Sequence, residues 1–482
     1  MTSLTSLSNH GYKIKKRDTD PKLIKECKDE LTVKPFTSND FGAKTETKFS
    51  LFLESPGSLY IPRFYGQEKF GQPDKTKLDE GTDIDISFSG SLREEQMPIV
   101  DLYMKAAEEK GGGLISLKCG GGKTVLALWI ASLLKKKTIV VVHKDFLMTQ
   151  WRDRILQFLP DAKIGKIQQN TIDIEDKDIV LAMVQSLSMK EYPEETFQSF
   201  GLAIFDECHH LGAETFSKAL PKVASKYMLG LSATPNRKDG LRRVFEWYIG
   251  NMVYISKDID LEDTIDVNVM EYYDDTESYC RQELTYMKKP CCPKIINNVC
   301  SHQARTLQIC NHIRELYTLK RRILILSDRR GHLDDIFKWC NENVCPSGLY
   351  VGGMKPHELR LSQEKDIILG TFSMAAEGMD IPKLNTIILA SPKSDVVQAV
   401  GRILREKPGV RTHNPLIIDY VDTHENFGIF KRQYAKRLAF YKKMQYNIKL
   451  HKSNGEIEDV KKSKRGRKKK EEVTIYETDC LF

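Results

Sequence analysis

The chain has 482 residues, of which 40% are hydrophobic and 29% charged, a composition typical of a globular protein with two or three domains. Residues 461–470 hold eight basic and no acidic residues, so removing their charge from the net charge of +8 leaves the rest formally neutral. The longest apolar stretch, residues 124–134, is much shorter than the roughly 20 residues that cross a bilayer, and the polar N-terminus lacks a secretory signal. Composition therefore argues against a membrane protein.

Residues 1–88 are expected to form a small N-terminal accessory module whose function the sequence does not indicate. Residues 1–45 are polar and lysine-rich, with weak periodicity. Residues 49–64 are typical of two short strands, and Ser55-Pro56-Gly57 between them is typical of a turn.

From residue 89 the chain alternates between strands and helices, which predicts a first lobe over residues 89–258. A helix is expected to open near Ser91, because Glu94 follows three residues later as in a capping box. Strands are expected at residues 114–117, 138–143, 178–183, 202–205 and 227–231, and helices at residues 125–134 and 151–159. This α/β alternation predicts a doubly wound parallel sheet with ligands at the carboxyl ends of its strands.

A second alternation predicts a second α/β lobe over residues 259–452. Its strands are expected to start near residue 267 and to follow at 322–327, 348–351, 366–371, 386–389 and 416–420, with helices at 305–319 and 332–340 and a basic helical stretch reaching Lys449. Residues 453–482 are charged and poor in apolar side chains, which predicts a disordered basic tail able to bind phosphates without reading sequence.

The segment Lys118-Cys-Gly-Gly-Gly-Lys-Thr124 lies between an apolar run and a helical run. Three consecutive glycines let backbone N–H groups close around an anion, and the helix behind them adds its positive dipole end. Lys123 can then reach the β- and γ-phosphates, and the Thr124 hydroxyl can bind Mg²⁺. The usual motif starts with a further glycine, where this chain has Leu117, so the match is incomplete. The alternative is a glycine-rich turn before a core helix.

Two further segments follow strands of the first lobe. Asp206 and Glu207 come after the apolar strand at 202–205, where one carboxylate can hold Mg²⁺ and the other can polarise an attacking water. Ser232 and Thr234 follow the next strand, and their hydroxyls can couple this site to a neighbouring interface. Taken alone, the two segments could also be an acidic turn and a capping turn.

In the second lobe, Gln398-Ala-Val-Gly-Arg-Ile-Leu-Arg405 is expected on a helix. Arg402 and Arg405 are three residues apart and therefore share a face. Two guanidinium groups suit the charge that develops on a transferring phosphoryl group. A solvated basic face is the alternative for an isolated pair.

The order of these segments resembles that of superfamily 2 helicases, most closely the XPB-type branch with its relatives in phages and large DNA viruses. The resemblance covers roughly residues 91–422. It rests on Gln96, the glycine loop, the DECH and SATP segments, and residues 371–380 and 398–405. It implies two tandem RecA-like lobes with a nucleic-acid-stimulated ATPase and helicase activity.

The resemblance also implies roles for individual residues. Catalysis would fall to Lys123, Asp206, Glu207, Arg402 and Arg405, with Mg²⁺ on Thr124 and Asp206. ATP would be bound by Gln96, which reads the adenine, and by Cys119, Gly120, Gly121, Gly122, Lys123, Thr124, Gly378 and Asp380. Nucleic acid would be contacted by Gln185, Ser186, Thr371 and Ser373, and Ser232 and Thr234 would couple the two activities.

The sequence thus predicts an ATP- and Mg²⁺-dependent DNA helicase or translocase with 3′-to-5′ polarity, acting in transcription or repair. An RNA-directed or transcript-releasing helicase and an ATP-gated nucleic-acid clamp remain alternatives. The eleven scattered cysteines favour a reducing intracellular compartment. The basic tail is compatible with nuclear targeting, and the viral resemblance with an infected cell or a virion.

Overall fold

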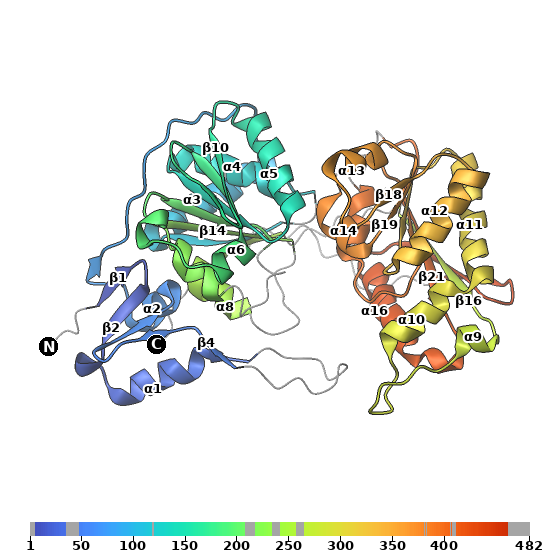
Figure 1. Ribbon diagram of the computed structural model, residues 1–482, viewed down its shortest axis with the longest axis horizontal. Coiled ribbons are helices and arrows are strands. Elements are labelled where there is room, and N and C mark those ends of the chain that lie inside the picture. The colour runs from blue at the N-terminus through green and yellow to red at the C-terminus, as the bar shows by residue number, and fades with distance from the viewer. Residues whose placement is uncertain are drawn as a thin grey trace. The chain divides into compact units, whose positions relative to one another are not determined.

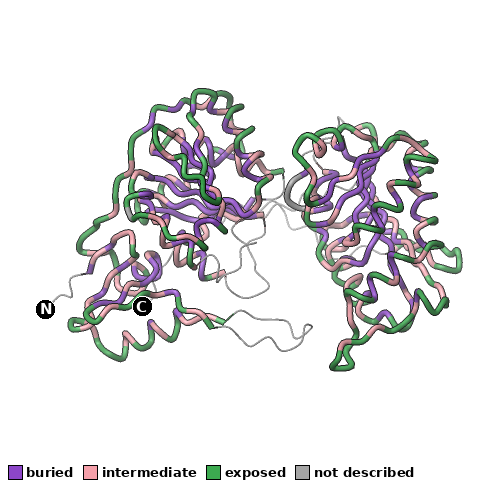
Figure 2. The backbone as a smooth tube through the Cα atoms, in the orientation of Figure 1, coloured by how far each residue is buried: buried purple, intermediate pink, exposed green. Residues whose placement is uncertain are grey.

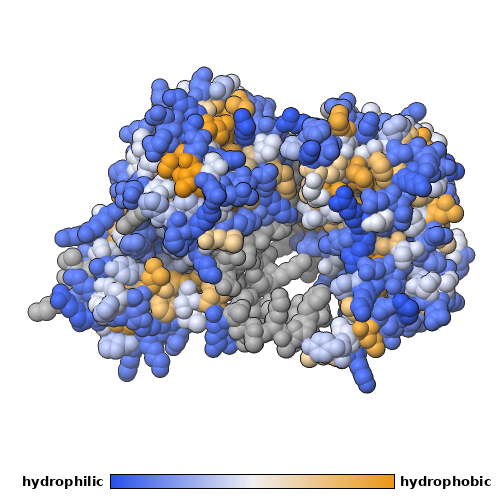
Figure 3. All heavy atoms as spheres, viewed as in Figure 1, coloured by the Kyte–Doolittle hydropathy of each residue, from blue (hydrophilic) through white to orange (hydrophobic). Residues whose placement is uncertain are grey.

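The computed structural model divides between residues 257 and 258 into two compact units. It describes residues 5–34, 48–117, 120–207, 217–233, 242–256, 265–379, 381, 383–404, 406 and 411–460. Within these ranges no helix is long and apolar enough to cross a membrane. The face seen in Figure 3 is mostly hydrophilic, with hydrophobic side chains in scattered groups.

The first unit begins with a small module around a five-stranded sheet of order β5-β6-β2-β1-β7 (Figure 1). Its elements are β1 (Ser6–Ser8), β2 (Gly11–Lys15), α1 (Pro21–Glu30), β3 (Thr32–Val33), β4 (Phe49–Ser50), β5 (Leu53–Glu54), β6 (Ser58–Ile61), α2 (Arg63–Phe70) and β7 (Lys75–Thr76). The predicted turn after residue 54 is confirmed, because the Ser55 amide donates to the Ser58 carbonyl over 2.9 Å and joins β5 to β6. The hairpin β1–β2 and helix α1 had no clear periodic signal.

The rest of the first unit is a doubly wound lobe on an eight-stranded sheet of order β11-β10-β12-β9-β13-β14-β8-β15, parallel except for β10–β11. Its strands are β8 (Gly112–Ser116), β9 (Thr138–Val142), β10 (Ile164–Gln168), β11 (Thr171–Asp173), β12 (Ile179–Met183), β13 (Leu202–Phe205), β14 (Tyr227–Ser232) and β15 (Met252–Ile255). Its helices include α3 (Met97–Lys110), α4 (Lys123–Leu134), α5 (Asp145–Phe158), α6 (Val184–Met189) and α8 (Arg242–Ile249).

Alternate residues of a central strand feed two separate cores, as a sheet covered on both faces requires. In β9, Val140 and Val142 pack with α3, α4 and α5, whereas Ile139 and Val141 pack on the opposite face with α6 and α8. All four are fully buried, and Figure 2 shows the strands as the buried centre of the lobe.

Residues 77–93 form a strap that joins the N-terminal module to this lobe. The Ile84 amide donates to the Lys135 carbonyl, and the Ser89 amide donates to the Phe158 carbonyl. Ile84 and Ile86 contribute to the core of the lobe. The strap therefore belongs structurally to the lobe that it precedes in the sequence.

The module also contacts the lobe directly. Tyr65 packs edge-on against Trp247 of α8, with 5.4 Å between ring centroids. The Arg63 guanidinium donates to the Lys226 carbonyl over 2.8 Å, and the Tyr248 hydroxyl donates to the Leu51 carbonyl over 3.0 Å. Module and lobe are thus joined by both apolar and polar contacts.

The second unit is another doubly wound lobe, on an eight-stranded sheet of order β18-β19-β17-β20-β21-β16-β22-β23, parallel except for β22–β23. Its strands are β16 (Asp266–Tyr272), β17 (Ile323–Leu326), β18 (Gly348–Tyr350), β19 (Ile367–Gly370), β20 (Thr386–Leu389), β21 (Leu416–Asp422), β22 (Asn447–His451) and β23 (Ile457–Val460). Its helices include α9 (Glu277–Cys280), α10 (Cys292–Ser301), α11 (Gln303–Thr318), α12 (Arg330–Asn343), α13 (Pro356–Gln363), α14 (Phe372–Gly378), α15 (Val397–Val400) and α16 (Gly428–Lys443).

Helices cover both faces of this sheet as well. In β17, Leu324 and Leu326 pack with α14, α15 and α16, and Ile323 and Ile325 pack with α11 and α12 on the other face. The two mixed α/β sheets confirm the predicted fold of two tandem doubly wound lobes.

Three local predictions were wrong. The expected capping box at Ser91 is absent, because a 3₁₀ turn begins instead at Glu94. At the start of this turn the Arg93 amide donates a hydrogen bond to the Gln96 side-chain carbonyl. The basic helix does not reach Lys449, since α16 ends at Lys443 and residues 447–451 form β22, where Ile448 is buried beside β16. The disordered tail predicted over residues 453–482 is also wrong at its start, because Ile457–Val460 form β23 and pair with β22. The rest of that tail, from residue 461 onward, lies outside the described residues.

Candidate nucleotide and nucleic-acid site

The glycine loop leaves the carboxyl end of β8 and leads into α4. Gly120 and Gly122 have φ angles of +76° and +77°, in the left-handed region that favours glycine. Gly122 is the N-cap of α4, so Lys123 and Thr124 occupy the first turn of the helix. This is the strand, loop and helix arrangement that was predicted from the sequence.

Gln96 is buried against the glycine loop rather than projecting into solvent. Its side-chain amide donates to the Gly121 carbonyl over 3.1 Å, and its carbonyl oxygen accepts from the Arg93 amide over 3.1 Å. A Cβ added at Gly122 would lie 2.6 Å from Gln96 Nε2. The backbone angle at 122 therefore favours glycine, and a Cβ there would also displace the end of the Gln96 side chain.

The two neighbouring carboxylates after β13 have different surroundings. Asp206 is buried, and its Oδ2 accepts a hydrogen bond from the indole N–H of Trp151 over 2.7 Å. Burial raises the pKa of Asp206 and the charge of Glu207 adds to this effect, whereas Lys123 and the Trp151 indole act against it. The Asp206 carboxylate is thus poorly solvated, and Lys123 and the Trp151 indole stabilise its charged form.

Glu207 lies closer to the glycine loop than its neighbour. Its Oε1 is 2.5 Å from Lys123 Nζ, and the two side chains are 16% and 13% exposed. Glu207 has a φ of +48°, which few non-glycine residues adopt and which directs successive carboxylates to different places. The fold thus brings together Lys123, Asp206 and Glu207 from two strands that lie on either side of β14.

This cluster offers oxygen ligands of the kind that Mg²⁺ prefers. The Asp206 carboxylate is desolvated, carries a raised pKa and lies beside a second carboxylate, so a cation at this point would relieve the unfavourable concentration of negative charge. Thr124 is half-buried in the first turn of α4, next to Lys123 in the chain. The residues present therefore fit a magnesium–nucleotide complex.

Three further predicted residues of the first lobe lie at the same carboxyl edge of the sheet. Ser232 is the last residue of β14 and is buried, and its carbonyl accepts from the Leu117 amide. Gln185 is exposed on α6 and donates to the His143 carbonyl over 2.8 Å. Ser186 is buried, and its hydroxyl accepts from the Gln169 amide over 2.8 Å. Gln185 is the more accessible of the predicted nucleic-acid contacts here.

In the second lobe, Thr371 and Ser373 stand where β19 ends and α14 begins. Their hydroxyls are 3.3 Å apart, and the Ser373 side chain is exposed. Gly378 is the last residue of α14. Arg402 lies in a 3₁₀ turn, Gly401–Leu404, and not in a continuing α-helix. It is buried and donates to the Met379 carbonyl over 2.9 Å.

Four predicted site residues lie outside the described residues, namely Cys119, Thr234, Asp380 and Arg405. Trp151 is the clearest contributor that sequence reasoning missed. It is 1% exposed on α5, where a tryptophan is usually a core residue, and it is 55 positions from Asp206 in the sequence. Only the packing of α5 over the sheet brings the indole to the carboxylate.

A family model described as "Type III restriction enzyme, res subunit" matches residues 89–237. "Putative ATP-dependent RNA helicase L396" of Acanthamoeba polyphaga mimivirus is 37% identical over 458 residues, 93% of this chain and 87% of that protein. "DNA 3'-5' translocase XPB2" of Sulfurisphaera tokodaii is 37% identical over 163 residues, 34% of this chain and 35% of that protein. Among solved structures, the match to that of T4 UvsW covers 93% of this chain and 98% of the T4 UvsW chain, with 18% identity and a TM-score of 0.37.

The glycine loop, the lysine and the paired carboxylates at one sheet edge, together with a second lobe of the same architecture, define a P-loop nucleoside triphosphatase of the two-lobed kind. The mimivirus relative narrows this class to one family, because it is 37% identical over 93% of this chain. The chain belongs to the superfamily 2 helicases and is an ATP-dependent helicase, related to proteins of large DNA viruses and, over part of its length, to the XPB translocases.

Proposed function

We propose that the chain is a motor that couples ATP hydrolysis to 3′-to-5′ movement on DNA. The observation that carries the proposal is the cluster of Lys123, Asp206 and Glu207, an intact set of groups for phosphoryl transfer at one edge of the sheet. Similarity to a protein named as a DNA 3′-5′ translocase supports the choice of DNA and of polarity.

Each member of the cluster has a proposed role. Lys123 neutralises the β- and γ-phosphates once the nucleotide draws it from Glu207. Asp206 and Thr124 would hold Mg²⁺, which would supply charge neutralisation at the phosphates. Glu207 then accepts a hydrogen bond from the attacking water. Gln96, already bound to the glycine loop, contacts the adenine, while Gly120, Gly121 and Gly122 surround the phosphates.

Lobe 2 contributes Arg402 as a catalytic residue and Gly378 to nucleotide binding. The bond from Arg402 to the Met379 carbonyl fixes the orientation of its guanidinium. Gln185, Thr371 and Ser373 are proposed to contact the phosphates and sugars of the strand, and Ser186 to support the backbone beside Gln185. Contacts of this kind suit a motor that moves over any sequence.

A second candidate is an RNA-directed helicase, because the mimivirus relative carries that label. Discrimination between the polymers depends on contacts to the 2′-hydroxyl. The relationship to this viral protein also supports action in a virus-infected cell, where a reducing compartment would keep the cysteines as thiols.

The deciding experiment measures steady-state ATPase activity of the wild type and of Glu207→Gln with no polymer, single-stranded DNA, duplex DNA or RNA. Stimulation by DNA that disappears in Glu207→Gln supports the proposal, and strand displacement from substrates with 3′ or 5′ overhangs then reports polarity. Stimulation by RNA alone replaces the first candidate with the second. Nucleotide-dependent polymer binding without turnover would indicate a clamp and contradict both.

A further inference from the structure

A hairpin between α9 and α10 projects from the second lobe and has an ordered turn at its tip. The Lys288 amide donates to the Thr285 carbonyl over 2.9 Å, and the Thr285 amide donates to the Lys289 carbonyl over 2.7 Å. Leu284 and Pro290 form an antiparallel bridge below this turn. Tyr286 and Met287 therefore occupy the two corner positions of a hydrogen-bonded β-turn.

The tip presents an aromatic ring and positive charge to solvent. Tyr286 is 85% exposed and Met287 is 47% exposed, so neither contributes much to a core. Lys288 and Lys289 follow at once and are exposed, and no acidic residue occurs between Glu283 and Lys294. An aromatic side chain followed closely by two lysines is complementary to a base next to its phosphates.

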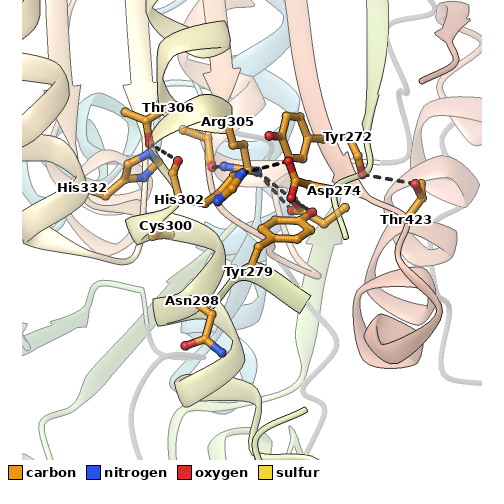
Figure 4. A network of polar contacts seen from close by, with 12 residues as sticks. Tyr272, Asp274, Tyr279, Asn298, Cys300, His302, Arg305, Thr306, His332 and Thr423 are labelled. Atoms are coloured by element: carbon orange, nitrogen blue, oxygen red, sulfur yellow. Dashed lines mark hydrogen bonds and ion pairs between the residues drawn. The ribbon is translucent and has the colours of Figure 1, made fainter. Parts of the chain in front are cut away.

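The base of this hairpin is fixed to the sheet by buried polar contacts. The Tyr279 hydroxyl of α9 donates to Asp422 Oδ1 over 2.7 Å, and Arg305 donates to both oxygens of the same carboxylate over 2.7 and 3.1 Å. Figure 4 shows Tyr279 beside Arg305 and His302, with Asn298 and Cys300 on the adjoining helix α10. Because Arg305 and Asp422 are fully buried, the hairpin extends from a part of the lobe that is held by a buried ion pair.

Where the hairpin ends and α10 begins, hydrogen bonds lead to the edge at which lobe 2 is proposed to contact nucleic acid. Arg329, which follows β17, donates to the Pro293 carbonyl in the first turn of α10 over 2.8 Å. Strand β17 lies next to β19, and the Ser327 amide donates to the Gly370 carbonyl immediately before Thr371. One set of contacts thus connects the start of α10 to the strand ends that carry Thr371.

We propose that this hairpin is a second nucleic-acid contact of lobe 2, in which Tyr286 stacks on an unpaired base and Lys288 and Lys289 bind the flanking phosphates. The inference rests on the proposed function, because it assumes that lobe 2 binds a strand. It adds residues outside the motifs of the family resemblance. A stacked base requires a single strand or an opened junction, so paired duplex is not a ligand for the tip.

The test compares full-length wild type with Tyr286→Ala, Tyr286→Phe and the double variant Lys288→Gln/Lys289→Gln. Leu319→Ala is the matched control, since Leu319 is also well exposed, at 60%, on the same lobe. Fluorescence anisotropy measures binding to a labelled single-stranded oligonucleotide and to blunt duplex, in DNA and RNA forms, over a range of salt concentrations. ATPase activity without polymer reports that the fold and the ATP site are intact.

Tyr286→Ala is expected to weaken single-strand binding about 10-fold, while Tyr286→Phe and the control bind as wild type, because stacking needs the ring and not the hydroxyl. The double lysine variant should reduce the slope of log K against log salt by about 1.4, from about 0.7 per phosphate contact on single strands. Duplex binding should not respond to Tyr286→Ala.

Wild-type affinity in Tyr286→Ala, an equal loss in Tyr286→Phe, or an equal loss on duplex would each overturn the stacking proposal. If polymer still stimulates the ATPase in that case, the motor function stands and only the hairpin's role falls. If the wild type binds no polymer and none stimulates its ATPase, both proposals fall, and a protein partner would be the better occupant of the tip.

Discussion

Replacing Glu207 with glutamine is expected to abolish turnover and at the same time to tighten ATP binding. Lys123 Nζ lies 2.5 Å from Glu207 Oε1, with both side chains largely shielded from water. A nucleotide must separate this pair before Lys123 can reach its phosphates. The carboxylate also repels the triphosphate, so neutralising it favours binding in two ways.

The size of the effect follows from the pair itself. A hydrogen bond to a charged group contributes about 1.5–3 kcal/mol net, and a neutral amide acceptor retains about half of that. The cost of releasing Lys123 therefore falls by about 1 kcal/mol, which corresponds to about fivefold tighter binding. Because Glu207→Gln does not turn over, its equilibrium affinity can be measured directly by the fluorescence of a labelled ATP analogue.

Two controls define the result. Lys123→Ala should lose most of the affinity, and Glu246→Gln should change nothing, because Glu246 pairs with Arg242 on α8 outside the cluster. An affinity for ATP in Glu207→Gln equal to or below that of the wild type would refute the view that the Lys123–Glu207 pair competes with the nucleotide.

Three other predictions concern single residues. Gly122→Ala should weaken ATP binding about tenfold in the same fluorescence assay, because alanine at a φ of +77° costs about 1–2 kcal/mol and its Cβ would meet Gln96; unchanged affinity would contradict this. Trp151→Phe should lower the free energy of unfolding by about 2 kcal/mol in urea titrations and raise the Mg²⁺ concentration needed for tight nucleotide binding, since Asp206 loses its indole donor; wild-type values for both would exclude a positioning role. Burial, and secondarily the charge of a buried arginine, lowers the pKa of His332 to about 3, so the folded state resists a proton that the unfolded chain accepts below about pH 6.5. Stability is then lost as pH falls below that value, by about 2 kcal/mol at pH 5, and His332→Asn should gain that amount relative to wild type between pH 8 and pH 5.

The sequence indicated those features that depend on local chemistry. Consecutive glycines after an apolar run located the phosphate loop, and apolar runs located strands such as β13 and β20 to the residue. Carboxylates directly after β13 predicted the acidic part of the site. In each case the signal lies within about ten residues of the chain.

Features that depend on long-range packing were not accessible in this way. The Trp151 indole reaches Asp206 only after α5 has packed on the sheet, and Arg305 meets Asp422 across 117 positions. Strand β22 was mistaken for helix because its basic residues continue the composition of α16, whereas pairing with β16 decides its structure. Hydrogen bonding between distant strands overrode local propensity there.

The strap over residues 77–93 makes the N-terminal module difficult to exchange as an independent cassette. A fragment that began at residue 89 would keep every recognisable helicase motif and yet lose Ile84 and Ile86 from the core of its first lobe. It would also leave the backbone carbonyl of Lys135 without the Ile84 amide. Recombination or truncation that preserves the lobe must therefore cut upstream of the strap. The segment that is inherited as a unit is thus expected to begin earlier in the chain than the first helicase motif.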